Sequence, residues 1–139
     1  MSRKPVCVDT SAWVALFSKD DQYHKPAKDY WQQLRSDKRL LLTNDYVLDE
    51  TYTILRRGKG SLPMAIAFHD LVEQSKIIEV AEINGSLRKQ AWQIFVNYQD
   101  KTLSFTDCVT FAQMRVQNAF EAFTFGSDFE RVGFLVRPE

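Results

Sequence analysis

This 139-residue chain has little of what marks the specialised protein classes. With only two cysteines and a length sufficient to bury a core, it does not need a disulfide framework. Its five glycines, four prolines and 45% hydrophobic residues exclude a disordered or collagen-like chain. No apolar run approaches the roughly 18 residues that span a bilayer, and the apolar residues ahead of Asp9 are too few for a secretory signal. We therefore expect a single cytoplasmic domain over residues 1–139, with no membrane segment.

The chain also lacks an excess of charge of either sign. It has 18 basic and 18 acidic residues, so its formal net charge is zero. This balance argues against a large positive surface of the kind that drives nonspecific nucleic-acid binding. It leaves open a local basic patch or a contact with phosphate through a metal ion. The glycine patterns of nucleotide-binding loops are absent as well, and neither His24 nor His69 has a plausible nucleophile partner in the sequence.

Short apolar runs alternate with longer helical patterns, which is typical of βαβ units around a parallel sheet. Strands are expected at 6–8, 40–43, 77–80 and 122–125, with 134–136 as a candidate fifth strand. Helices are expected at 11–17, 24–35, 45–57, 62–74, 84–98 and 106–117. The third helix should end at Gly58, followed by a turn at Lys59-Gly60. The pattern predicts an α/β fold with a mostly parallel sheet of four to five strands and helices on both faces.

Four acidic residues fall at the points where such a sheet binds ligands. Asp9 directly follows the first strand, Asp128 follows the fourth, and Glu50 and Asp107 lie near the starts of two helices. Because ligands bind at the carboxyl ends of parallel strands, where the following helices begin, these acids are predicted to converge on one rim. Oxygen ligands without Cys or His favour Mg²⁺ or Mn²⁺, and such an ion would offset the repulsion between clustered carboxylates. All four are candidate catalytic and metal-binding residues.

Each of these acids also has a structural interpretation. Asp9 could cap the helix that it precedes, and Asp107 stands three residues after Ser104 in the pattern of a capping box. Asp128 could be an ordinary loop residue. Glu50 falls at the border of the apolar stripe of its helix, whereas Asp49 falls on the solvated side, so Glu50 is the preferred site residue. A carboxylate at that border needs a partner, which could be a metal ion, an Arg or a Lys.

Four sequence motifs in this order resemble those of PIN domains, especially the VapC-type toxins of toxin–antitoxin pairs. They are Asp9-Thr10-Ser11-Ala12-Trp13-Val14-Ala15-Leu16-Phe17, Thr43-Asn44-Asp45-Tyr46-Val47-Leu48-Asp49-Glu50-Thr51, Leu103-Ser104-Phe105-Thr106-Asp107-Cys108, and Ala122-Phe123-Thr124-Phe125-Gly126-Ser127-Asp128-Phe129 followed by Gly133-Phe134. The likeness extends over about residues 6 to 136. It implies a three-layer α/β/α sandwich, Mg²⁺- or Mn²⁺-dependent cleavage of RNA, and often a homodimer bound to a small antitoxin protein.

The resemblance implies that Asp9, Glu50 and Asp107 are the acids of the first three motifs. The last motif differs from the most common pattern, because many relatives carry an Asp where this chain has Gly126. Other relatives carry the acid directly before the Phe, as Asp128 does here. Either Asp128 supplies the fourth carboxylate or the site has three.

The leading hypothesis is a hydrolytic ribonuclease, the toxin of a toxin–antitoxin pair, that uses these acids and a divalent ion. The alternative that Gly126 keeps open is a catalytically inactive PIN-like module that binds RNA or a protein partner. A phosphatase of the haloacid-dehalogenase kind also starts with an Asp after its first strand. That chemistry needs a second Asp two residues later, where this chain has Ser11.

Overall fold

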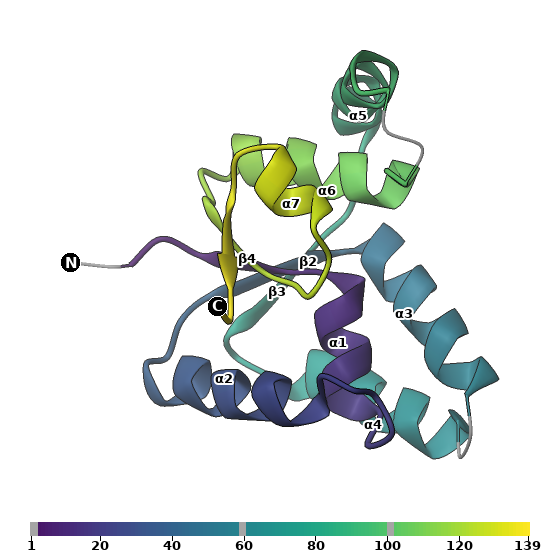
Figure 1. Cartoon of the computed structure of the whole chain (residues 1–139), viewed down its shortest axis with the longest axis vertical. Helices are drawn as coiled ribbons and strands as arrows, with labels where there is room; N and C mark the ends of the chain where they lie inside the picture. Colours follow the sequence, from purple (N-terminus) through teal and green to yellow (C-terminus); the bar gives the residue numbers. More distant parts are fainter. Residues whose placement is uncertain (1–2, 59–60, 100–101) are drawn as a thin grey trace.

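The computed structural model describes residues 3–58, 61–99 and 102–139 and shows a sheet between two layers of helices (Figure 1). The strands of the described residues are β1 (Val6–Val8), β2 (Leu41–Asn44), β3 (Ile78–Ala81), β4 (Glu121–Phe123) and β5 (Leu135–Arg137). They lie in the order β3-β2-β1-β4-β5, and every neighbouring pair is parallel. The predicted three-layer α/β/α fold with a parallel sheet is confirmed, and the candidate fifth strand is part of that sheet.

Each expected helix is present, with ends within two residues of the prediction. The helices are α1 (Thr10–Phe17), α2 (His24–Ser36), α3 (Asp45–Arg57), α4 (Ser61–Gln74), α5 (Gly85–Asn97), α6 (Phe105–Val116) and α7 (Asp128–Arg131). The sequence did not predict α7, because a single turn is too short to show a helical period. The turn predicted at Lys59-Gly60 lies outside the described residues. Among the described helices, none is both long and apolar enough to span a bilayer.

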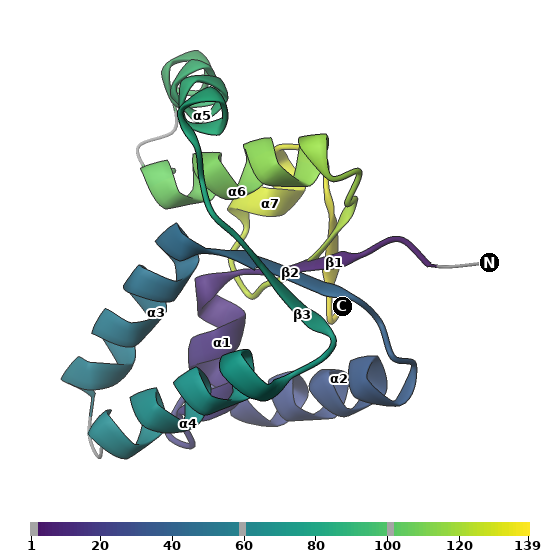
Figure 2. The same ribbon diagram turned by 180° about the vertical axis from the view of Figure 1, so that it is seen from behind.

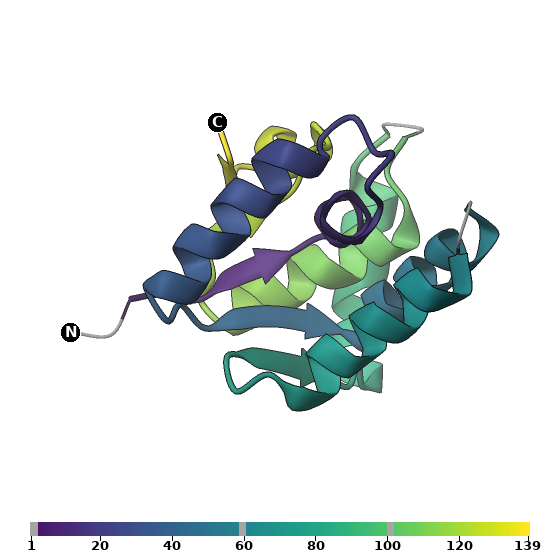
Figure 3. The same cartoon turned by 90° about the horizontal axis from the view of Figure 1, so that it is seen from below.

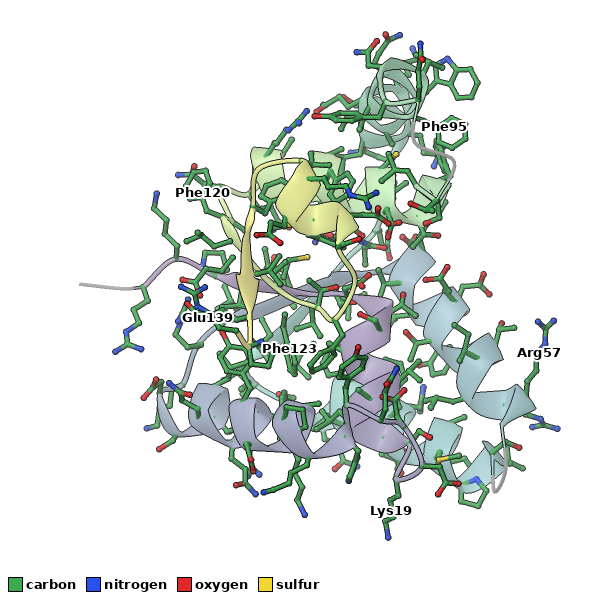
Figure 4. All side chains as sticks on the ribbon, in the orientation of Figure 1. Lys19, Arg57, Phe95, Phe120, Phe123 and Glu139 are labelled. Carbon is green, nitrogen blue, oxygen red and sulfur yellow. The ribbon has the colours of Figure 1, made fainter. Side chains whose placement is uncertain are left out.

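The strands separate two apolar cores, because successive side chains of a strand point to opposite faces of a sheet. Val6 and Val8 pack with the side chains of α1–α4, and Cys7 packs with those of α5, α6 and α7 on the other face. The two views from front and back show these helix groups on opposite sides of the sheet (Figures 1 and 2). Phe123 of β4 points toward α2, where the Tyr30 ring lies 4.9 Å away in an edge-to-face contact (Figure 4).

The path of the chain creates a ligand-binding position at the carboxyl end of β1. From β1 the chain runs through α1 and α2 to β2 and β3, and later through α5 and α6 to β4 and β5 on the opposite side of β1. Figure 3 shows β1 ending at the start of α1. The strand order therefore reverses between β1 and β4, and open α/β sheets bind ligands at such a point.

A buried amide network links the start of α3 to the last turns of α6. The Asn44 side chain caps α3 by accepting a hydrogen bond from the Val47 amide at 2.9 Å. Its Nδ2 donates to Oε1 of Gln113 on α6 at 2.8 Å, and both side chains are buried. The helices that carry Glu50 and Asp107 are thus joined by hydrogen bonds inside the protein, where polar groups need such partners.

Candidate functional site

Asp9 lies at the carboxyl end of β1 and is buried. It occupies the position that precedes α1, but its side chain makes no capping hydrogen bond. Its Oδ2 instead accepts hydrogen bonds from the hydroxyls of Ser11 at 2.8 Å and Thr124 at 2.9 Å. Burial raises the pKa of Asp9, and these two hydroxyls oppose that rise. Because Thr124 directly follows β4, its hydrogen bond to Asp9 joins the carboxyl ends of β1 and β4 at the switch point of the sheet.

Asp107 both caps α6 and lies close to the other predicted acids, the two interpretations that the sequence left open. Its amide donates to Oγ of Ser104 at 3.0 Å and its Oδ2 accepts from the Ser104 amide at 3.2 Å, so the capping box at the start of α6 is confirmed. The pKa of Asp107 is raised to about 7, first by burial and then by the negative charges of Asp9 and Asp128. Capping therefore does not remove Asp107 from the electrostatic field of the other acids.

The other two predicted acids are Glu50 on α3 and Asp128 at the start of α7. Glu50 is half-buried on α3, whereas its neighbour Asp49 is exposed. Among the residues that the structure describes, Glu50 has no hydrogen bond or ion pair. Asp128 begins α7, accepts a hydrogen bond from the Thr102 hydroxyl at 3.1 Å and pairs with Arg131 at 3.5 Å. It is therefore held in place and is not a free loop residue.

All four predicted acids line one cavity of about 490 Å³ at the carboxyl edge of the sheet. The other lining residues are Thr10, Ser11, Val14, Asp21, Gln22, Tyr23, Ile54, Ser104, Phe125 and Gly126. Among the described residues that line the cavity there is no Lys or Arg. Carboxylates that come from four separate parts of the chain thus face a shared space, and Arg131, the ion-pair partner of Asp128, does not line it.

The side chains around this cavity suit a hard divalent cation. Carboxylate and hydroxyl oxygens are the polar donors, and the thiols of Cys7 and Cys108 are free and buried elsewhere. Oxygen donors of this kind fit Mg²⁺ or Mn²⁺. The pKa of Asp107 is raised by burial and by repulsion from Asp9 and Asp128, and such an ion would relieve the repulsion. Within the described part of the chain, no three acidic, His or Cys side chains already form a metal-holding group. A bound ion would therefore need water to complete its shell, as Mg²⁺ commonly does.

Neither Thr124 nor Ser11 was among the residues predicted from the sequence to form the site. In the structure both hydroxyls donate to the same oxygen of Asp9, and they lie 3.2 Å from each other. A Thr directly after an apolar strand was the available signal for Thr124. Gly126 lines the cavity, and a Cβ there would meet only the Thr124 hydroxyl at 3.7 Å. The absence of an acid at Gly126 is therefore not imposed by a lack of space.

Known proteins are similar to this chain in sequence and in fold. The family model for the PIN domain matches residues 6–135. The 23S rRNA-specific endonuclease VapC20 of Mycobacterium tuberculosis is 35% identical over 135 residues, which are 96% of this chain and 99% of that protein. The crystal structure of M. tuberculosis VapC20, a toxin that cleaves the sarcin–ricin loop, matches with a TM-score of 0.81 at 33% identity, covering 94% of this chain and 96% of that one.

More distant structures share the fold alone. VapBC2 from Rickettsia felis, bound to a DNA fragment from its promoter, gives a TM-score of 0.68 at 13% identity and covers 95% of this chain and 96% of that one. The family match over nearly the whole chain, together with the extensive likeness to VapC20, shows that this chain belongs to the PIN domain family.

Proposed function

We propose that this protein is a metal-dependent endoribonuclease that hydrolyses RNA phosphodiester bonds as the toxin of a toxin–antitoxin pair. The observation that carries the proposal is the convergence of Asp9, Glu50, Asp107 and Asp128 on one cavity at the switch point of the sheet. The likeness to an endonuclease specific for 23S rRNA supports RNA as the substrate. A stem-loop with the sarcin–ricin sequence is the first RNA to test, because a relative of similar length cleaves that loop.

The four carboxylates would hold Mg²⁺ or Mn²⁺ at the cavity. When bound, such an ion supplies Lewis-acid polarisation of the phosphate and lowers the pKa of water. The chain's own contribution is to hold the acids in position: Ser11 and Thr124 orient Asp9 through two hydroxyl hydrogen bonds. Partners of this kind hold carboxylate ligands in the orientation that a metal requires.

Asp128 would take the place of the acid that many relatives carry at the position of Gly126. Its position in the same cavity supports this role. We expect Asp128→Ala to lower metal affinity and cleavage, and Gly126→Asp in that background to restore part of both, since a Cβ at position 126 would meet only the Thr124 hydroxyl at 3.7 Å. An Asp128→Ala variant that cleaves like the parent protein would indicate a site of three acids.

We also propose that this protein binds a small antitoxin protein and forms a homodimer. A small antitoxin protein and a second copy of this chain would both cover apolar surface. Exposed apolar side chains support such contacts, among them Ile54, Leu62 and Ile66 on α3 and α4 and Trp92 and Val96 on α5. Light scattering on the purified protein would measure the predicted homodimer, and a monomer at micromolar concentration would contradict it. The proposed place of action is the cytoplasm, where the RNA substrate would be present.

The decisive experiment incubates purified protein with labelled RNA and Mg²⁺ or Mn²⁺, with EDTA as a second condition. Asp9→Asn keeps an oxygen that can accept from Ser11 and Thr124, so the fold should survive. We expect cleavage to fall by more than about 100-fold in this variant, because loss of even an outer-shell partner costs 10- to 100-fold. Glu50→Gln should have a similar effect.

Asp49→Asn is the matched control, because Asp49 is an exposed acid next to Glu50 and does not line the cavity. It should cleave like the unchanged protein. Cleavage that persists in EDTA or in Asp9→Asn would contradict the proposal. RNA binding without cleavage under any metal condition would favour an inactive PIN-like module instead.

A further inference from the structure

We propose that Tyr23, supported by Phe125, forms a stacking platform for one unpaired base of the RNA at the edge of the acidic cavity. This inference rests on the proposed ribonuclease function and adds to it a contact that recognises a base. Tyr23 lies in the segment between α1 and α2, and Phe125 follows β4. Both residues line the cavity that contains the four acids.

The rings of Tyr23 and Phe125 are already stacked on each other. Their centroids are 4.6 Å apart and their planes differ by only 5°. Phe125 covers one face of the Tyr23 ring, and Tyr23 is 40% exposed, so the open area falls on its other face and edges. A flat nucleobase placed on that face would extend the stack by one layer.

Hydrogen bonds from different parts of the chain hold this platform before any ligand binds. The Tyr23 amide donates to Oδ1 of Asp21 at 2.8 Å, and the Phe125 amide donates to Oγ of Ser11 at 3.0 Å. Phe125 also contacts the ring of Phe123 edge-on at 6.1 Å. A platform that is already ordered loses less conformational entropy on binding than a mobile one.

The negative charge of the cavity favours an uncharged contact with the RNA. Its described lining includes five carboxylates, the four proposed metal-binding acids and Asp21, and no Lys or Arg. The labelled side chains of Lys19 and Arg57 point outward from the molecule (Figure 4). Arg131 does not line the cavity either, and it is already paired with Asp128 at 3.5 Å. Stacking of a base on an aromatic ring does not depend on a charged side chain and therefore suits an acidic cavity.

The platform fits an unpaired base and not a duplex. A base stacked in a helix has no free face, whereas a base in a loop can turn outward onto a protein ring. Gln22, an exposed neighbour of Tyr23 in the lining, carries an amide that could bond to the edge of such a base. The phosphate next to this base would then lie over the acids, which links base recognition to the position of cleavage.

The test measures binding of an RNA hairpin in which one loop base at a time is replaced by fluorescent 2-aminopurine. Ca²⁺ replaces Mg²⁺, and a gel verifies that the RNA stays intact. We expect the unchanged protein and Tyr23→Phe to quench the fluorescence at one loop position. Tyr23→Ala and Tyr23→Leu should lose that quenching and raise the Kd by about 5- to 150-fold, the range that stacking of one base provides. The Leu variant retains apolar packing against Phe125 without an aromatic face.

Tyr98→Ala is the matched control, because Tyr98 is 38% exposed and does not line the cavity. It should bind like the unchanged protein. An unchanged Kd and unchanged quenching in Tyr23→Ala, or full binding by Tyr23→Leu, would overturn the platform. If the protein cleaves RNA and Tyr23→Ala binds normally, the platform fails and the nuclease stands. If nothing is cleaved but binding depends on Tyr23, the platform stands and the nuclease fails.

Discussion

The raised pKa of Asp107 predicts how the stability of the metal-free protein depends on pH. The pKa is about 7 in the folded protein, against an ordinary value of 3.8, because of burial and the charges of Asp9 and Asp128. Between pH 3.8 and about pH 7, the carboxyl of Asp107 holds its proton in the folded state and has lost it in the unfolded state. The free energy of unfolding therefore falls as pH rises, by about 1.4 kcal/mol per pH unit, and is constant above pH 7 as far as this group is concerned.

Asp107→Asn removes this effect with little other change. The Asn oxygen can still accept the hydrogen bond from the Ser104 amide, so the start of α6 keeps its cap. In EDTA the variant should gain stability relative to the unchanged protein as pH rises from 5 to 8. The two pH units between 5 and 7 give a relative gain of about 2.7 kcal/mol, an upper value because Asp107 is only half-buried.

Urea denaturation at pH 5, 6, 7 and 8 measures this difference directly. Asp49→Asn, a change at an exposed acid, should show a constant offset over the same range. Adding Mn²⁺ at 100 times its Kd should offset the relative gain of the variant at pH 8, because an ion that binds the folded state of the unchanged protein stabilises it by about 2.7 kcal/mol. A difference between Asp107→Asn and the unchanged protein that is the same at pH 5 and pH 8 would refute the raised pKa.

Three further substitutions test the packing that positions the site, each measured by urea denaturation. Phe68→Ala empties a fully buried position between α4 and α1 and should lower the free energy of unfolding by about 3–5 kcal/mol; a loss below about 1 kcal/mol would contradict its burial. Ser104→Ala removes the hydroxyl that accepts from the Asp107 amide and should cost about 1 kcal/mol, with Ser104→Thr closer to the unchanged protein. Gln113→Leu leaves the buried carbonyl of Thr43 without its donor and should cost about 1–3 kcal/mol, whereas an unchanged stability would mean that water replaces the amide.

The order of helices and strands could be predicted because each element has a local signature. The apolar run 6–8 and the helical period of 45–57 appear in the sequence as they do in the structure. The starts of α3 and α6 follow from Asn44 and Ser104, whose side chains accept from amides three residues ahead. The single turn of α7 has no such periodicity and was missed.

The alternatives at the acids show where local reasoning reaches its limit. Capping and participation in the acidic cavity were treated as competing interpretations of Asp107, yet the structure shows both. For Asp9 the capping interpretation was wrong for the side chain, because two hydroxyls take its oxygen. The wheel of α3 correctly separated the half-buried Glu50 from the exposed Asp49. The catalytic role of these acids stays a prediction.

The sequence by itself determined the elements, their order and the placement of acids beside strand ends, because these features depend on neighbours a few residues apart. Only the tertiary structure decided which side chains meet. Thr124 bonds Asp9 across 115 positions of the chain, and Tyr23 stacks on Phe125 from another element. The pKa of Asp107 likewise depends on its burial and on the charges of Asp9, which follows β1, and of Asp128 on α7. Such contacts are set by strand register and by how helices pack on the sheet, and no local pattern encodes them.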